Sequence, residues 1–234
     1  MALLFEPSPI PFVPHQPNWR QPLYLHYKPL LRVLASKLSV LRGRVLDVGC
    51  GMQPYRALLQ QERCEYVGLD RVGPLSRPDV IGTAESLPFL DSSFDHVLST
   101  QVLEHVVDPL SALRECSRVL KPNGTIVFTV PGVWPAHEVP HDYWRFTRFG
   151  VTALLERTGF AEIAVTQAGG FWASEGQMMN LELQRGTFLR DLVPLVNLGA
   201  DWLDQRGSSE EMALAWIATA RKVHTPHSPH PTAP

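Results

Sequence analysis

Short apolar runs of strand character alternate with segments of helical apolar spacing through the middle of this chain. The strand-like runs cover residues 44–49, 65–70, 79–82, 94–100, 125–130, 161–167 and 213–221. Helical spacing covers residues 30–41, 55–61, 110–120 and 147–157. This alternation predicts a three-layer α/β domain with a doubly wound, mostly parallel seven-stranded sheet and right-handed crossovers.

One segment interrupts the alternation before the last strand. Residues 177–205 carry an apolar stripe at helical spacing, and Pro194 is placed to kink this stripe or split it in two. We interpret it as a helical insertion with three open roles: a helix pair packed on the domain, a wall of the substrate pocket, or a face for a membrane or a second subunit. The domain is expected over residues 23–222, between a proline-rich segment (1–22) and a disordered Pro/His tail (223–234).

Composition narrows the function classes. A chain of 234 residues suits one domain with a sizeable core, and its net charge of −2 disfavours a nucleic-acid partner. No uncharged apolar run approaches the ~18 residues that span a bilayer, and the proline-rich start is unlike a signal peptide. Cys50, Cys64 and Cys116 form no CxxC pair, which indicates reduced thiols and a cytoplasmic protein.

The loop after the first strand carries the candidate chemistry. It begins at Asp47 and contains Gly49 and Gly51, and glycines let the backbone approach a ligand closely. The second strand ends in Asp70, where a carboxylate can accept hydrogen bonds from both hydroxyls of a ribose. Because ligands of open parallel sheets lie beyond the carboxyl ends of the strands, these residues predict a nucleotide site.

Four short sequence motifs follow one another along the chain, beginning in the first predicted strand. They are LDVGCG at 46–51, AESLPF at 84–89, FDHVLSTQVLEH at 94–105 and LKPNGTIVFTVP at 120–131. In order and spacing they resemble the class I S-adenosylmethionine-dependent methyltransferases of the type 11-like group, over about residues 44–168. The resemblance implies a Rossmann-like fold, S-adenosyl-L-methionine as the cofactor, and methyl transfer to oxygen or nitrogen of a small-molecule, glycan or lipid-linked acceptor.

The resemblance also implies roles for single residues. Those assigned to the cofactor are Asp47, Gly49, Cys50 and Gly51 around the methionine part, Asp70 and Arg71 at the ribose, Ala84 and Leu87 at the adenine, and Gln101 below the sulfonium. The family often has an aspartate before the alanine of the second motif. Thr83 stands there in this chain, so the contact with the adenine amino group is expected to pass to Glu85.

Two other interpretations of the nucleotide site stay open. A dinucleotide-binding dehydrogenase needs a third glycine where Pro54 stands, and Asp47 would repel a pyrophosphate but attract a cationic sulfonium. A non-catalytic relative that binds the cofactor as a partner subunit would carry the same motifs. Methyl transfer is the function we expect.

Methyl transfer mainly requires alignment, with the acceptor atom and the methyl carbon about 3–3.5 Å apart and collinear with the leaving sulfur. A general base is needed only where the acceptor is protonated at working pH. Glu104 and His105 follow the fourth strand and resemble the EMLEH segment of ubiquinone-pathway O-methyltransferases, in which both acids and the histidine are proposed to bind a divalent metal. Because Gln101 replaces the first acid, and an amide is a poorer ligand for a hard cation, we expect no metal.

A second group of polar and aromatic residues follows the fifth strand. The segment HEVPHDYWRFT at 137–147 resembles one found in methyltransferases of small molecules and glycans. His141 is the preferred base and His105 the other candidate. Tyr143 and Trp144 would form the walls of the pocket, and Arg145 would anchor an anionic or sugar group. Alternatively, these residues only hold a lid on the domain.

The chain from residue 7 to residue 46 contains six basic residues and no acid. They are Arg20, Lys28, Arg32, Lys37, Arg42 and Arg44. A solvated helix face explains them; contact with a phosphate-bearing acceptor or an anionic membrane surface is the alternative. The oligomeric state is left open by the sequence.

Overall fold

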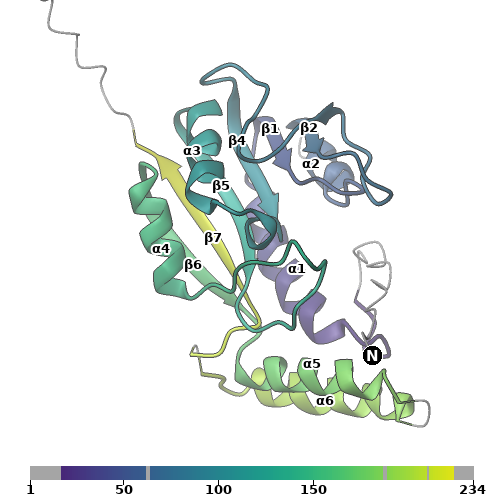
Figure 1. Cartoon of the computed structure of the whole chain (residues 1–234). Coiled ribbons are helices and arrows are strands. Elements are labelled where there is room, and N and C mark those ends of the chain that lie inside the picture. The colour runs from purple at the N-terminus through teal and green to yellow at the C-terminus, as the bar shows by residue number, and fades with distance from the viewer. Residues whose placement is uncertain (1–16, 62–63, 187–188, 210, 224–234) are drawn as a thin grey trace, which may run out of the picture.

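A seven-stranded sheet forms the centre of the protein, which a computed structural model describes over residues 17–61, 64–186, 189–209 and 211–223 (Figure 1). The strands are β1 (Gly43–Val48), β2 (Cys64–Asp70), β3 (Val80–Ile81), β4 (Phe94–Thr100), β5 (Leu120–Pro131), β6 (Phe160–Ala168) and β7 (Ala215–Lys222). Their order is β3-β2-β1-β4-β5-β7-β6, and only β7 runs in the direction opposite to the other strands. The predicted mostly parallel sheet is confirmed. The tail from residue 224 and most of the proline-rich segment lie outside the described residues.

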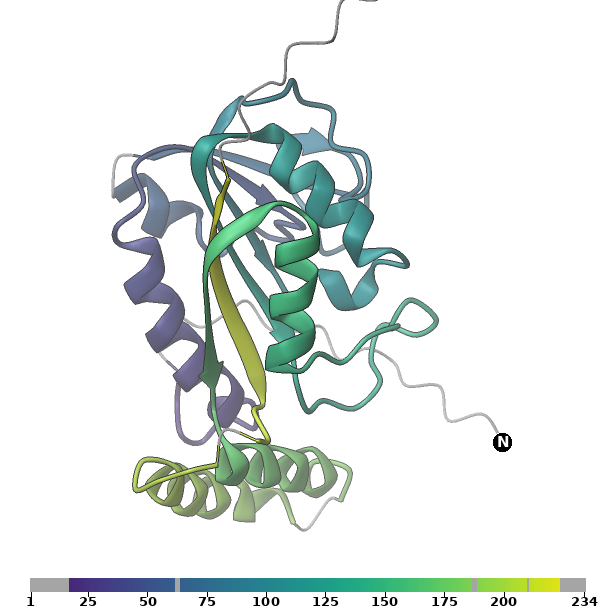
Figure 2. The same cartoon turned by 90° about the vertical axis from the view of Figure 1, so that its left-hand side faces the viewer.

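Helices cover both faces of the sheet (Figure 2). They are α1 (Tyr24–Leu38) and α2 (Arg56–Gln61) on one face, and α3 (Pro109–Val119) and α4 (Arg148–Arg157) on the other. β5 shows why its apolar run is nearly continuous. Phe128 packs in the core with α3 and α4, whereas Val127 packs with α1 and α2, and each side chain is 1% exposed.

Most predicted strands and helices of the α/β core agree with the structure to within two residues, but two do not. α1 begins at Tyr24, six residues before the predicted helix, because the structure accommodates Pro29 inside it, where proline usually interrupts helical hydrogen bonding. β5 begins at Leu120, so residues 121–124 lie in a strand and not in the predicted turn. The pairing register with β4 shifts there, and Asn123 has a φ of 63°. The spacing of apolar residues does not predict such a local irregularity in a strand.

The predicted insertion is a helical hairpin at one end of the molecule (Figures 1 and 2). α5 (Phe171–Leu183) begins before the predicted boundary, and α6 (Val193–Asp204) follows a short turn, η2 (Arg190–Leu192). Of the two effects predicted for Pro194, the structure shows a split and no kink: the stripe forms two helices, and Pro194 lies in the first turn of the second. Two buried amides join the helices, since Asn180 Nδ2 donates to Asn197 Oδ1 at 2.7 Å.

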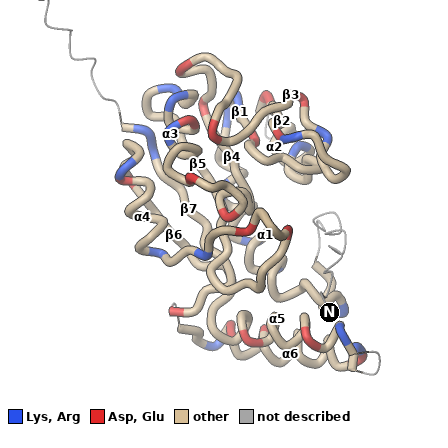
Figure 3. Tube along the Cα trace, viewed as in Figure 1, with Lys and Arg blue, Asp and Glu red and all other residues tan. Residues whose placement is uncertain are grey.

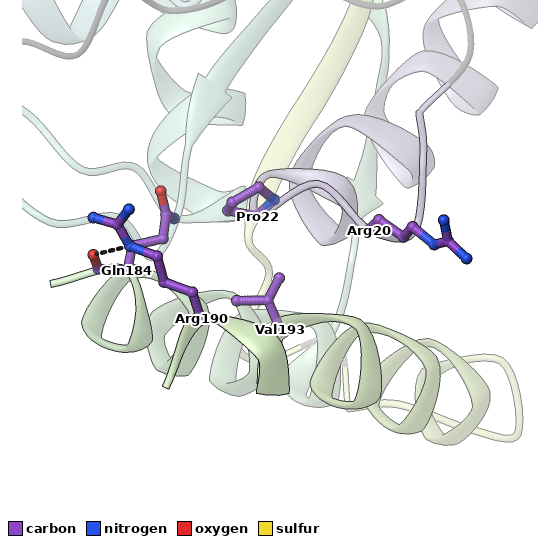
Figure 4. A pocket seen from close by; sticks show the side chains of 5 residues that line it. All are labelled: Arg20, Pro22, Gln184, Arg190 and Val193. Carbon is purple, nitrogen blue, oxygen red and sulfur yellow. Dashed lines mark hydrogen bonds between the residues drawn. The ribbon is translucent and has the colours of Figure 1, made fainter. Parts of the chain in front are cut away.

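The hairpin is also fastened to the chain before α1. Asn197 Nδ2 donates to the backbone oxygens of Trp19 and Gln21, and Gln177 Nε2 donates to that of Pro22. A hollow of about 330 Å³ lies beside this junction, and Figure 4 shows the arginines that line it pointing apart. Its lining residues are Arg20, Pro22, Gln184, Arg190 and Val193.

Both signs of charge occur along the described residues of the hairpin (Figure 3). Of the predicted basic face, Lys28 pairs with Asp201 of α6, and Arg44 pairs with Glu65 of β2. In the described part of the chain, no helix has the length and apolar character needed to cross a membrane.

Candidate functional site

The loops after β1, β2 and β4 meet at one edge of the sheet because these three strands are parallel neighbours. The β1 loop is fastened to the end of β2: the backbone N–H groups of Gly49 and Cys50 donate to the Leu69 carbonyl, and that of Gly51 donates to Asp70 Oδ2 at 2.8 Å. Asp70 therefore helps to hold the glycine loop in place. It is also the residue predicted to bind the ribose. The other oxygen, Oδ1, accepts from the Arg71 N–H.

The two loop glycines do different things. Gly49 has a φ of +73°, and a Cβ there would lie 2.3 Å from Val102 Cγ2, so the β1 loop packs directly on the turn after β4. Gly51 has a φ of +51°, and a Cβ there would meet only the Leu75 carbonyl at 3.7 Å. Gly49 thus permits close packing between loops, whereas Gly51 leaves space for a ligand.

Asp47 lies beneath this loop, 1% exposed, where its Oδ2 accepts from the Tyr66 hydroxyl at 2.6 Å and its Oδ1 has no partner. Burial raises the pKa of Asp47 to about 7; the nearby Asp70 also raises it, while the bond from Tyr66 lowers it. An unpartnered carboxylate oxygen beside a second carboxylate favours a cation with hydrogen-bond donors. The residues therefore fit a positively charged sulfur nucleoside better than a pyrophosphate.

Asp47 is expected to make folding less favourable as the pH rises. Its pKa is raised from the ordinary 3.8 to about 7, so between these values the folded protein keeps a proton that the unfolded chain has lost. The stability that this proton supplies is complete below about pH 4 and disappears as the pH rises through 7. Asp47→Asn removes the titration, so urea unfolding from pH 5 to 8 should show a flatter profile and, at pH 8, greater stability than the natural chain.

Two tyrosines and a thiol that face Asp47 do not supply this slope. They are Tyr66, Tyr55 and Cys50. Burial raises the pKa of both tyrosines and brings the pKa of Cys50 to about 12, so none of these three titrates in the range. Glu65→Gln, an exposed change on β2, is the matched control. An unchanged slope in Asp47→Asn would contradict the assignment.

The predicted adenine residues lie after β3. Ala84 is half-buried, Leu87 is buried with its N–H donating to Glu115 Oε2, and Glu85 is exposed. Gln101 follows β4 with a φ of 54°, and its side chain donates to Thr129 Oγ1 at 3.1 Å. These residues follow the carboxyl ends of parallel strands of the sheet, and their individual contacts with the cofactor stay predictions.

The segment after β5 is held in place by Arg145. Its guanidinium donates to both carboxylate oxygens of Asp142 at 2.7 Å and to the carbonyls of Trp134 and Pro135. This pairing and a backbone bond from His137 help to lower the pKa of Asp142 to about 2, although burial acts in the opposite direction. Arg145 is thus occupied inside the protein, while its proposed role as an acceptor anchor stays a prediction.

The same segment carries histidines to the turn after β4, the 3-10 turn η1 (Leu103–His105). His105 Nδ1 lies 2.7 Å from the His141 carbonyl, and the rings of His105 and His137 are 4.8 Å apart. Glu104 is fully buried beside them, and its burial raises its pKa to about 8. The His141 side chain is exposed, and its Nδ1 lies 3.1 Å from the Tyr143 hydroxyl. His105 and His141, both predicted as candidate bases, are therefore brought together.

Sequence reasoning missed two residues near this edge. Tyr66 looked like an ordinary strand residue, yet its hydroxyl is the partner of Asp47. His26 of α1 is buried against the Trp134 ring at 4.7 Å, and burial lowers its pKa to about 4. Strand alternation could have flagged Tyr66 as facing the same side as the core, but no sequence signal joins residues 26 and 134.

Comparison with known proteins finds sequence similarity over the part of the chain that carries the four motifs. Residues 46–128 match the sequence model of a family described as "Methyltransferase domain". The ubiquinone biosynthesis O-methyltransferase of Aliivibrio fischeri (strain MJ11) is 33% identical over 129 residues, which are 49% of this chain and 52% of the relative. The demethylmenaquinone methyltransferase of Paenarthrobacter aurescens (strain TC1) is 37% identical over 106 residues, 41% of this chain and 42% of the relative. The chain thus spans about half the length of the curated relatives it matches.

Solved structures share the fold at low identity. Phosphoethanolamine N-methyltransferase 2 of Haemonchus contortus, solved with S-adenosyl-L-methionine, has a TM-score of 0.57 and 19% identity, covering 82% of this chain and 52% of that one. The [4+2]-cyclase SpnF has a TM-score of 0.57 and 23% identity, covering 85% and 82%. Since these two proteins have different named activities, the fold alone does not fix the reaction.

Proposed function

Because this chain carries the domain of the class I S-adenosylmethionine-dependent methyltransferases, we propose that it transfers a methyl group from S-adenosyl-L-methionine to a hydroxyl oxygen of a small-molecule acceptor. The observation that carries the proposal is the pair of carboxylates at the strand ends: Asp47 with its unpartnered oxygen, and Asp70 bonded to the glycine loop. Both would favour a cationic nucleoside.

The chain's own residues mainly have to bind and align the reactants. Asp70 and Gly51 hold the loop at the cofactor, and the segment after β5 closes over the acceptor side. When bound, the cofactor supplies an electrophilic methyl group: the acceptor oxygen forms the new C–O bond, the C–S electron pair leaves with sulfur, and the acceptor's proton goes to a base. Alignment of this kind supplies up to about 7–11 kcal/mol of the barrier reduction.

An aromatic hydroxyl acceptor is supported by the surroundings and by the relatives. Trp134, His137, Tyr143 and Trp144 lie on the segment after β5, and the last two are each about 40% exposed (42% and 43%). Exposed aromatic side chains can stack on a planar ring. The two relatives are named for ubiquinone and menaquinone pathways, which makes a hydroquinone or catechol the first acceptor class to test.

His141 is expected to take the acceptor proton. The Tyr143 hydroxyl can accept a hydrogen bond from Nδ1–H of His141, and in this tautomer Nε2 is unprotonated and can accept the proton. His141→Ala should lower the methyl-transfer rate about 10²–10⁴-fold, the usual contribution of a general base. S-adenosylmethionine affinity, measured by calorimetry, should stay unchanged, and equal turnover in both proteins would remove His141 from the mechanism.

The proposed function is tested with the full chain, tritium-labelled S-adenosylmethionine and a panel of hydroquinones, catechols, amines and glycans. Label transferred to a hydroquinone or catechol oxygen is the expected result, and label on an amine or glycan would overturn the acceptor class. Cofactor binding without transfer to any acceptor would indicate the non-catalytic alternative. Absence of cofactor binding, with NADH bound instead, would indicate the dehydrogenase.

A further inference from the structure

Two histidines and one buried carboxylate meet between the turn after β4 and the segment after β5. One potential ligand atom from each of Glu104, His105 and His137 lies within 4.8 Å of the other two. Glu104 is 0% exposed, and neither of its side-chain oxygens has a hydrogen-bond partner. A buried carboxylate without donors is costly, and a bound cation would offset that cost.

His105 is oriented as a metal-binding histidine usually is. His105 Nδ1 lies 2.7 Å from the His141 carbonyl, which can only accept, so Nδ1 carries the proton and Nε2 presents a lone pair. His137 Nδ1 lies 3.3 Å from Asp142 Oδ2 and 3.5 Å from Arg145 Nη2, so an acceptor and a donor both face this nitrogen. Backbone carbonyls and carboxylates in these positions are the usual outer partners of metal-binding imidazoles.

The spacing within the cluster is too wide for direct hydrogen bonds. His105 Nε2 lies 4.0 Å from Glu104 Oε1 and 3.8 Å from Glu138 Oε2. Ligands at about 2.0–2.2 Å from a tetrahedral zinc ion lie about 3.4 Å from one another, so small side-chain shifts would close these groups on one ion. The groups thus surround a common point without bonding each other.

We propose that Glu104, His105 and His137 bind a divalent cation of the zinc class, with Glu138 as a further ligand. Two imidazoles and a carboxylate are a donor set that zinc favours, unlike the all-oxygen sets of magnesium and calcium. Gln101 is no part of the set, because its side chain is directed to Thr129. His137, from a different segment of the chain, supplies the ligand that the sequence around residues 101–105 lacks.

The site would also serve the reaction. A bound cation with one open position could hold an acceptor hydroxyl and lower its pKa, which makes proton removal easier. This consequence rests on the proposed function, whereas metal binding itself does not. A zinc titration therefore tests metal binding, and an S-adenosylmethionine titration tests the proposed function, so either proposal can be contradicted without the other.

The first experiment titrates chelator-treated full-length protein with Zn²⁺ alone, by calorimetry. One ion per chain is expected, and both Glu104→Gln and His137→Ala should weaken binding by at least about 100-fold, since even outer-shell changes cost about 10–100-fold. His141→Ala is the matched control, because its exposed side chain is directed to Tyr143 and its carbonyl is retained. Far-UV circular dichroism confirms folding, and the nearly isosteric Glu104→Gln decides the outcome if His137→Ala unfolds.

A second variant set excludes adventitious binding by the tail. His224, His227 and His230 are replaced together by alanine in the full chain, and the zinc site should persist. Co²⁺ in place of zinc should give a visible spectrum typical of nitrogen and oxygen ligands, without a thiolate charge-transfer band. Binding that survives Glu104→Gln, or that is lost only with the tail histidines, would overturn the proposal.

Discussion

Gly49→Ala is expected to destabilise the protein by about 2–5 kcal/mol and to abolish cofactor binding. About 1–2 kcal/mol comes from placing a side chain in the left-handed backbone region, since φ is +73°. A further 1–3 kcal/mol, roughly, comes from overpacking, because the new Cβ would lie 2.3 Å from Val102 Cγ2. Urea unfolding measures the loss of stability, and calorimetry with S-adenosylmethionine measures the loss of cofactor binding.

Two other variants separate backbone strain from the steric clash. Gly159 has a φ of +82°, and a Cβ there would meet nothing within 4 Å, so Gly159→Ala should cost only the strain. Val102→Ala in the Gly49→Ala background should recover part of the loss, because the clashing methyl groups are gone. Equal destabilisation by Gly49→Ala and Gly159→Ala, without rescue, would show that loop-to-loop packing is unimportant.

Asp70→Ala is expected to weaken S-adenosylmethionine binding by at least about 100-fold. Hydrogen bonds to a charged acceptor contribute about 1.5–3 kcal/mol each, and two ribose hydroxyls would lose them together. The substitution also releases the Gly51 N–H, which Asp70 Oδ2 holds at 2.8 Å, so the loop loses order as well. Calorimetric titration of the folded variant gives the loss directly.

Glu65→Ala is the matched control for Asp70→Ala. Glu65 is an exposed carboxylate on the same strand, paired with Arg44 at the opposite end from the site. Its loss should leave the affinity within about twofold, since exposed ion pairs contribute about 0–1 kcal/mol. Undiminished binding by Asp70→Ala would remove the ribose contact and with it the basis of the proposed function.

Much of the fold was predictable because it depends on local patterns. The alternation of strand-like and helical segments predicted a three-layer domain, and the burial of Val127 and Phe128 on opposite faces of β5 confirms it. The boundaries that differed have local causes that pattern rules treat as stops: Pro29 inside α1 and the positive φ of Asn123 within β5. Tertiary packing stabilises both exceptions.

The residues of the candidate site also include some that the sequence predicted and some that it did not. Gly49, Gly51 and Asp70 could be predicted from the sequence, because strand-end position and backbone freedom are properties of short segments. The partnership of Asp47 with Tyr66, the occupation of Arg145 by Asp142, and the meeting of His137 with Glu104 could not.

By itself, the sequence determined which residues end the strands and therefore where a nucleotide can bind. Only the tertiary structure decided which distant side chains share a buried space: residues 104 and 137 come together because β4 and β5 are parallel neighbours whose following segments emerge at one edge. Spacing along the chain governs the first kind of contact. Burial, charge and the order of strands in the sheet govern the second.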